Sequence, residues 1–371
     1  MSKARQLADL GNVYDDGALS NRNLIINGAM QVAQRGTSDV TGLTQASDGY
    51  KTVDRWRFNA NGGSNTGQIT MSFETDAPND FKYSTKYLVT TADTDIGTDG
   101  DLRLETHLEA QNLRHLNFGS SNAKQLTLSF WVKSNKIGNY SAGLYMDSAS
   151  NSNNQISQGY TINASGTWEY KTLTFVGNTG TTMNTTDNDH GLRVWFFQAA
   201  GSDYKGESSN TWGGTSHRAI GQDVNLYDTV NNYFQITGVQ LEVGDTATPF
   251  EHRSYGDELA RCQRYFLMCK PETSAGITHA GFANLNARST TARYSVVHFP
   301  VSMRVRPSVA YSGSLTAYSG SGSYAVSAIS MNGSTEHAAE MEITAASGAT
   351  VGHGGWVRIL ADAYVEFDSE L

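Results

Sequence analysis

Residues 126–134 read LTLSFWVKS, and the alternation in this stretch decides the fold. Every second residue is apolar, so an extended chain here has one apolar face and one mixed face. The apolar face carries Leu126, Leu128, Phe130 and Val132. A strand of this kind covers a core with one face only, so the stretch predicts a strand of a β-sandwich.

Other segments extend the same prediction. The alternation continues in TWEYKTLTFVG at residues 167–177, while LRVWFFQA at 192–199 is apolar on both faces and is predicted to be a central strand. In YFQITGVQLEVG, residues 233–244, the apolar positions change phase halfway along. A β-bulge at Thr237 and Gly238 would reconcile the two halves.

The composition favours the same class. The chain has 371 residues, of which 38% are hydrophobic, with 37 glycines and only 5 prolines. This profile is typical of many short strands joined by polar turns, in a chain long enough for two domains. Alternation returns at residues 292–303 and 363–371, around a Gly/Ser-rich stretch at 311–327 that reads as a loop. The sequence therefore predicts an all-β protein with a second, smaller β-sandwich.

Charge and hydropathy exclude two classes of partner. The net charge is −9 and there is no Lys/Arg-rich run, so no nucleic-acid partner is predicted. No run of about eighteen apolar residues occurs, so neither membrane insertion nor a signal peptide is expected.

One helix interrupts the strands. Ser254 and Asp257 form a start like a capping box, and an apolar stripe follows at helical spacing. The stripe consists of Tyr255, Leu259, Cys262 and Phe266. The pattern predicts a connecting helix over 254–268 within a junction at residues 254–270. Its stripe would serve domain docking or a contact between chains, with Leu259, Cys262 and Phe266 as the junction residues. Cys262 and Cys269 would lie about 10 Å apart on one helix, too far for a disulfide.

The first 22 residues form a separate segment. A short helix is predicted over residues 4–10, with Leu7 on its apolar side. A helix this short cannot bury its own face, so it needs the chain's own body, sister chains or another protein as its partner. Residues 1–22 are predicted to be an attachment segment.

Three blocks together resemble a known family. NLIINGAMQVAQRGTS at 23–38, YKTVDRWRF at 50–58 and VQLEVGDTATPFEHRSYGDELARCQRYF at 239–266 resemble recurrent blocks of bacteriophage tail-fibre and related virion proteins. The resemblance implies a jelly-roll β-sandwich at 23–253, similar to carbohydrate-binding modules, followed by a distal β domain at 271–371. It also implies a homotrimer in the virion that binds other tail, neck or baseplate proteins through its N-terminal segment and adheres to host surface glycan. The alternative is a carbohydrate-binding module of a bacterial surface or catabolic system.

Several aromatic residues are candidates for ligand binding. Exposed rings suit sugars because the C–H face of a pyranose packs on them. The candidates beside polar loops of the first domain are Trp168, Tyr170, Tyr204 and Trp212, and those of the distal domain are Tyr311, Tyr318 and Tyr324. The alternative is that these rings cap the sandwich or seal a trimer contact. Two other tryptophans, Trp56 and Trp356, are expected in the core.

No catalytic, cofactor or metal site is predicted. Glycan hydrolysis needs two carboxylates at a set separation, and the acidic pairs in this sequence, such as Glu105 and Glu109, are close only by chance. Nucleophile, P-loop and metalloprotease motifs are lacking, and the two cysteines are too far apart for a metal site. The sequence therefore predicts a non-enzymatic protein.

Overall fold

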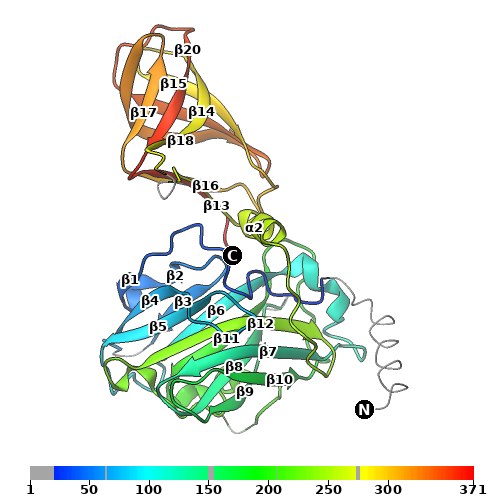
Figure 1. The fold of residues 1–371 in the computed structure, drawn as a ribbon. Helices are drawn as coiled ribbons and strands as arrows, with labels where there is room; N and C mark the ends of the chain where they lie inside the picture. The colour runs from blue at the N-terminus through cyan, green and yellow to red at the C-terminus, as the bar shows by residue number, and fades with distance from the viewer. Residues whose placement is uncertain (1–20, 63–64, 149–153, 207, 273–275) are drawn as a thin grey trace. The chain divides into compact units, whose positions relative to one another are not determined.

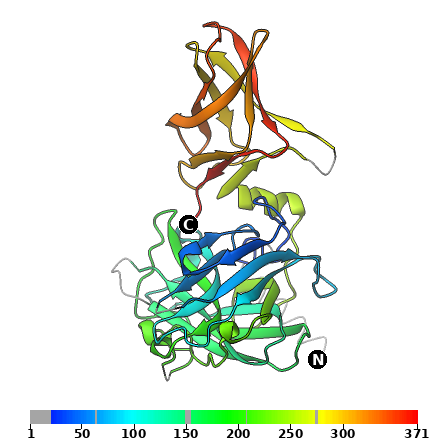
Figure 2. The same cartoon turned by 90° about the vertical axis from the view of Figure 1, so that its left-hand side faces the viewer.

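The computed structural model describes residues 21–62, 65–148, 154–206, 208–272 and 276–371. The described backbone forms two compact units, which divide between Tyr255 and Gly256 (Figures 1 and 2). Strands dominate both units, so the all-β prediction is confirmed. The helix predicted at 4–10, with Leu7, lies outside the described residues.

Two six-stranded antiparallel sheets make up the first unit. Sheet A runs in the order β1 (Val40–Leu43), β4 (Gln68–Glu74), β5 (Ser84–Thr91), β12 (Tyr233–Val243), β7 (Leu126–Ser134), β10 (Glu169–Phe175). Sheet B runs in the order β2 (Gly49–Tyr50), β3 (Arg57–Asn61), β6 (Asp101–Glu109), β11 (His190–Ala200), β8 (Gly138–Met146), β9 (Asn154–Ile162). The chain crosses between the sheets at most connections, as in a jelly roll. The 3₁₀ turns are η1 (Gln45–Ser47), η2 (Ala110–Leu116), η3 (Ser202–Tyr204), η4 (Thr215–His217) and η5 (Leu226–Asp228).

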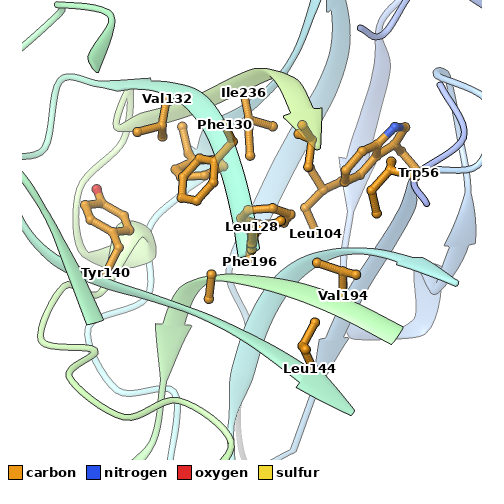
Figure 3. Packing of buried hydrophobic residues seen from close by; sticks show 14 of the residues in the cluster. Trp56, Leu104, Leu128, Phe130, Val132, Tyr140, Leu144, Val194, Phe196 and Ile236 are labelled. Carbon is orange, nitrogen blue, oxygen red and sulfur yellow. The ribbon is translucent and has the colours of Figure 1, made fainter. Parts of the chain in front are cut away.

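The core lies between the sheets and follows the predicted alternation. The four apolar residues predicted for one face of β7 are all buried in it. Figure 3 shows Phe130 and Val132 of β7 and Val194 and Phe196 of β11 pointing into the same space. Trp56 is also fully buried, as expected, and its indole Nε1 donates a hydrogen bond to the Asn27 carbonyl at 3.0 Å.

Two finer predictions about strands are also confirmed. The pairing of β12 with β7 shifts register between Thr237 and Gln240, and Gly238 has φ +61°. Because of this bulge, residues on both sides of it reach the same core. Strand β11 lies at the centre of sheet B, with Trp195 and Phe197 buried on its outer face.

The segments that enter and leave the first unit are joined side by side. Arg22 Nη1 donates a hydrogen bond to Thr248 Oγ1 at 2.6 Å, and the backbone N–H of Asn23 donates to the Glu251 carboxylate at 2.9 Å. Arg253 Nη1 donates to the Ile25 carbonyl at 3.0 Å. Residues 22–25 and 248–253 therefore form a terminal clamp on the sandwich.

In the second unit, six strands close into a barrel, whereas a sandwich was expected. The barrel order is β14 (His279–Ala287), β15 (Ala292–His298), β19 (Ala338–Ala345), β18 (Gly322–Ser334), β17 (Leu315–Ser319), β20 (Gly354–Leu360), and β20 pairs with β14. A three-stranded sheet of β13 (Phe266–Cys269), β21 (Tyr364–Asp368) and β16 (Ser308–Ser312) completes the unit. A sandwich and a barrel share the same side-chain alternation, so the sequence pattern could not distinguish them.

The connecting helix is shorter than predicted. Helix α2 (Tyr255–Gln263) ends before residue 268, because Phe266 already belongs to β13 and pairs with Asp368. The two cysteines thus lie on different elements, and neither forms a disulfide.

The stretch at 311–327 is likewise not a loop. It contains β17, the end of β16 and the start of β18. Ser319 pairs with Gly322 across a two-residue turn in which Gly320 has φ +59°. A turn of this kind needs a positive φ, which glycine adopts without steric penalty, so Gly-rich sequence marks a hairpin here.

Candidate functional site

Two predicted ligand-binding residues of the first unit are packed against the protein. Tyr204 is buried, and its hydroxyl donates a hydrogen bond to the Asp99 carbonyl at 2.7 Å. The Arg218 Cζ atom lies over the Tyr204 ring, 4.4 Å from its centroid. Trp212 is half-buried against Phe118, with 5.6 Å between ring centroids, and its Nε1 is bonded to a backbone carbonyl. Both rings are thus held in place by contacts within the first unit.

The three predicted tyrosines of the second unit lie on strands and not together. Tyr311 and Tyr324 pack against the core of the second unit, and each donates its hydroxyl to a backbone carbonyl, of Ser327 and Gly348 respectively. Tyr318 instead lies on the outer face of the barrel, where its ring stacks on that of Trp356.

The predicted junction residues differ in exposure. Cys262 and Phe266 are buried in the single chain, whereas Leu259 is half-buried. Leu259 is therefore the one described member of this set that keeps appreciable surface for a contact with another chain.

A groove of about 880 Å³ lies on the outer face of sheet A. Its floor is formed by paired residues of β7 and β10, because Trp131 is opposite Tyr170 in the strand register and Ser129 is opposite Thr172. The Trp131 and Tyr170 rings lie 5.4 Å apart at 51°, and Tyr170 is 46% exposed. The floor therefore offers two rings beside the exposed Thr172 hydroxyl, while Ser129 is buried.

Three aromatic rings from outside β7 and β10 form the wall. Phe81 lies 4.9 Å from Phe250 and 5.4 Å from His252, measured between centroids. Phe81 also covers Gly238 at the bulge of β12, where a Cβ would come within 2.6 Å of the ring. Because Gly238 at the bulge has no side chain, the Phe81 ring can pack directly on the backbone of β12. The terminal clamp holds the segment that carries Phe250 and His252.

Polar groups line the rim. Asp80 and Asp245 are exposed and contribute carboxylates to the groove. On the same face of sheet A, the Trp168 indole donates to Asp76 at 3.3 Å, and Lys133 forms an ion pair with Asp76 at 2.5 Å. Rings, hydroxyls and carboxylates together can pack on apolar faces of a ligand and bind its hydroxyl groups.

Sequence reasoning named Tyr170 and Trp168 but missed Trp131, Phe81 and Phe250. Trp131 did leave a signal, since it interrupts the polar face of β7 between Ser129 and Lys133. A large ring at a solvent-facing position of an amphipathic strand indicates a contact surface.

A cluster of buried charges lies on the outer face of sheet B. Arg103 of β6 binds Asp101 at 2.5 Å and Glu105 at 2.9 Å, and Arg57 also binds Glu105. Burial alone would raise the pKa of Glu105, but Arg103 and a hydrogen bond with His107 hold that pKa well below its usual range. A carboxylate kept ionised in this way has no proton to donate near neutral pH, so Glu105 is not a candidate general acid.

The described ranges also lack two other features. No group of three or more His, Cys, Asp or Glu side chains there is placed to hold a metal ion. No helix in that part of the chain is long and apolar enough to cross a membrane.

Comparison with known proteins gives only faint similarities. No family model and no curated protein sequence matches the chain. The enzymatically active domain of tailspike protein 4 from bacteriophage CBA120 is 14% identical over 60% of this chain and 22% of its own, with a TM-score of 0.33. The family 11 carbohydrate-binding module of cellulase Lic26A-Cel5E from Clostridium thermocellum is 12% identical over 58% of this chain and 99% of its own, with a TM-score of 0.28. TmCBM61, solved with β-1,4-galactotriose, is 10% identical over 60% of this chain and 100% of its own, with a TM-score of 0.29. These values are too low to assign a ligand.

Proposed function

We propose that this chain is a non-catalytic glycan-binding protein, and that the groove on sheet A holds the glycan. The observation that carries the proposal is the Trp131–Tyr170 floor, in which Tyr170 is exposed and Trp131 is half-buried. A pyranose ring has C–H faces that pack on aromatic rings and equatorial hydroxyls that bond to side-chain oxygens. The floor and rim supply both kinds of group within one groove.

The exposed carboxylates support binding over hydrolysis. Glycosidases place two carboxyl groups on either side of the scissile bond, and the proton donor is held in a site that keeps it protonated. Asp80 and Asp245 are both open to solvent. Incubation with bound polysaccharide should release no reducing ends, and release that disappears in Asp80→Asn or Asp245→Asn would make the protein an enzyme.

Removing the groove rings should abolish most glycan binding. We expect Trp131→Ala and Tyr170→Ala each to weaken binding at least about fivefold, since a stacked ring contributes about 1 kcal/mol or more. Tyr170→Phe keeps the ring and should retain most of the affinity. The measurement is affinity electrophoresis of the full chain in gels containing bacterial surface polysaccharide, followed by calorimetry. Ile137→Ala, at a side chain 55% exposed outside the groove, is the surface control. Equal binding by Trp131→Ala and the wild type would rule out the groove.

We also propose that the protein is a homotrimeric fibre of a bacteriophage virion, attached to the particle through residues 1–22. This part is supported by the sequence blocks at 23–38, 50–58 and 239–266. Trimers raise the avidity of weak glycan sites by placing several copies within reach of one surface.

Sedimentation equilibrium of the full chain should give the mass of three chains at micromolar concentration. Leu259→Asp should lower that mass, because it places an unpaired charge in the contact between chains. Leu259→Met should not, because methionine is apolar and has a volume similar to that of leucine. A single-chain mass for the wild type would contradict the fibre assignment while leaving the groove proposal intact.

A further inference from the structure

A second aromatic surface lies on the barrel of the second unit. Trp356 of β20 and Tyr318 of β17 are opposite each other in register, and both point outward. Their rings stack with 5.4 Å between centroids and 13° between planes. Trp356, expected in the core, is 44% exposed, because its neighbour Val357 is the residue that points inward. The strand phase therefore puts the indole on the surface.

The close approach of the two strands depends on a glycine. A Cβ on Gly355 would lie 1.8 Å from the Tyr318 carbonyl oxygen, so no larger residue fits there without moving the backbone. On the Tyr318 ring, the Arg358 guanidinium lies 4.8 Å from the centroid. The Tyr318 ring thus contacts both the Trp356 ring and the Arg358 guanidinium. Trp356 is the ring of the pair that has a face open to a ligand.

Amide groups adjoin that ring. Asn284 of β14 is the register partner of Trp356, and Asn286 follows two residues later on the same exposed face. Neither side-chain amide has a hydrogen-bond partner among the described residues. Each amide can therefore donate to and accept from a ligand.

A shallow groove of about 320 Å³ begins at these amides. It is lined by Asn284, Leu285, Asn286, Tyr294, Ser295, Val296 and Glu340. Val296 is 58% exposed, and Glu340 is an exposed carboxylate on the neighbouring strand. The band from Trp356 to Glu340 thus contains a ring, two amides, an apolar patch and a hydroxyl acceptor.

We propose that this band is a second carbohydrate-binding surface that takes a neutral oligosaccharide. Trp356 packs on one pyranose face, and Asn284 and Asn286 bind its hydroxyls. Glu340 accepts from a further hydroxyl and disfavours sulfated, sialylated or other anionic sugars through like-charge repulsion. The surface lies wholly within the second unit and does not require the groove on sheet A to bind anything.

The test uses the full chain carrying Trp131→Ala and Tyr170→Ala, so that the groove on sheet A is removed. This chain is screened against neutral and anionic oligosaccharides by saturation-transfer NMR, and affinities are then measured by titration. We expect it to keep binding neutral oligosaccharides. Adding Trp356→Ala should weaken that binding at least about tenfold, and adding Asn284→Ala about threefold or more. Trp356→Phe should keep much of it, and Val351→Ala, at an exposed side chain outside the band, should change nothing.

Three results would overturn the proposal: no glycan binding by the chain without the groove, unchanged binding with Trp356→Ala, or a preference for anionic sugars. If Trp356→Ala instead lowers the mass in sedimentation without affecting glycan binding, the band is a contact between chains and the proposal is wrong. Loss of binding only with Trp131→Ala would support the groove alone, and loss only with Trp356→Ala would support this band alone.

Discussion

Replacing Arg103 by methionine is expected to lower the free energy of unfolding by about 3–5 kcal/mol. Arg103 is 6% exposed at its side chain and bonds to two fully buried carboxylates, of Asp101 and Glu105. Methionine fills much of the volume but leaves both negative charges without their central partner. Removing one member of a buried ion cluster is costly because the remaining charges keep their desolvation penalty.

Urea unfolding followed by far-ultraviolet circular dichroism measures this effect. The matched control is Lys86→Met, which breaks a partly exposed pair with Glu74 at 3.5 Å and should cost less than about 1 kcal/mol. Adding Asp101→Asn and Glu105→Gln to Arg103→Met should recover much of the loss, since the two buried negative charges that lost Arg103 are then gone. Equal effects of Arg103→Met and Lys86→Met would show that the cluster is hydrated.

The second large effect concerns acid. Burial lowers the pKa of His107 to about 4, against the opposing attraction of Glu105 at 3.3 Å. Between the unfolded value near 6.5 and about 4, the unfolded chain binds a proton at this residue and the folded chain does not. The free energy of unfolding is therefore not reduced by His107 above about pH 6.5. As the pH drops below that value the free energy of unfolding falls, and at pH 4 the loss due to His107 is about 3 kcal/mol.

His107→Gln should remove this dependence. We expect the difference in unfolding free energy between wild type and variant to change by about 2 kcal/mol from pH 6.5 to pH 5. The difference is the correct quantity because other groups titrate nearby. Burial raises the pKa of Asp101, which gives the opposite sign near pH 4, whereas the depressed pKa of Glu105 makes stability fall as the pH drops below its ordinary value of 4.5. A difference that does not change with pH would mean that His107 takes up its proton in the folded state.

The fold of the first unit could largely be predicted from local pattern. The alternation in residues 126–134 specifies which side chains of β7 enter the core, and the change of phase near Thr237 specifies a bulge. What local pattern cannot supply is the identity of the neighbouring strand. The barrel closes through β14 and β20, whose segments are far apart in the chain, and nothing in either segment alone reveals that pairing.

The candidate site was harder to predict for the same reason. The groove combines residues 80–81, 129–131, 170–172 and 245–252, which only the folding of sheet A brings together. Rings in polar loops looked exposed from sequence, yet Tyr204 and Trp212 are packed, because a loop can fold back over the sandwich. Trp131, on a strand, is by contrast one of the rings that line the groove.

The terminal clamp has a mechanical consequence. Tension applied to the chain on either side of the first unit enters at residues 22–25 and leaves at residues 248–253, which are bonded directly to each other. The load therefore passes through Arg22, Glu251 and Arg253, and the jelly roll lies outside the path of the force. While these bonds hold, pulling on the protein does not stretch the core or the floor of the groove on β7 and β10, and a ligand held on that floor is carried by strands that are not under strain.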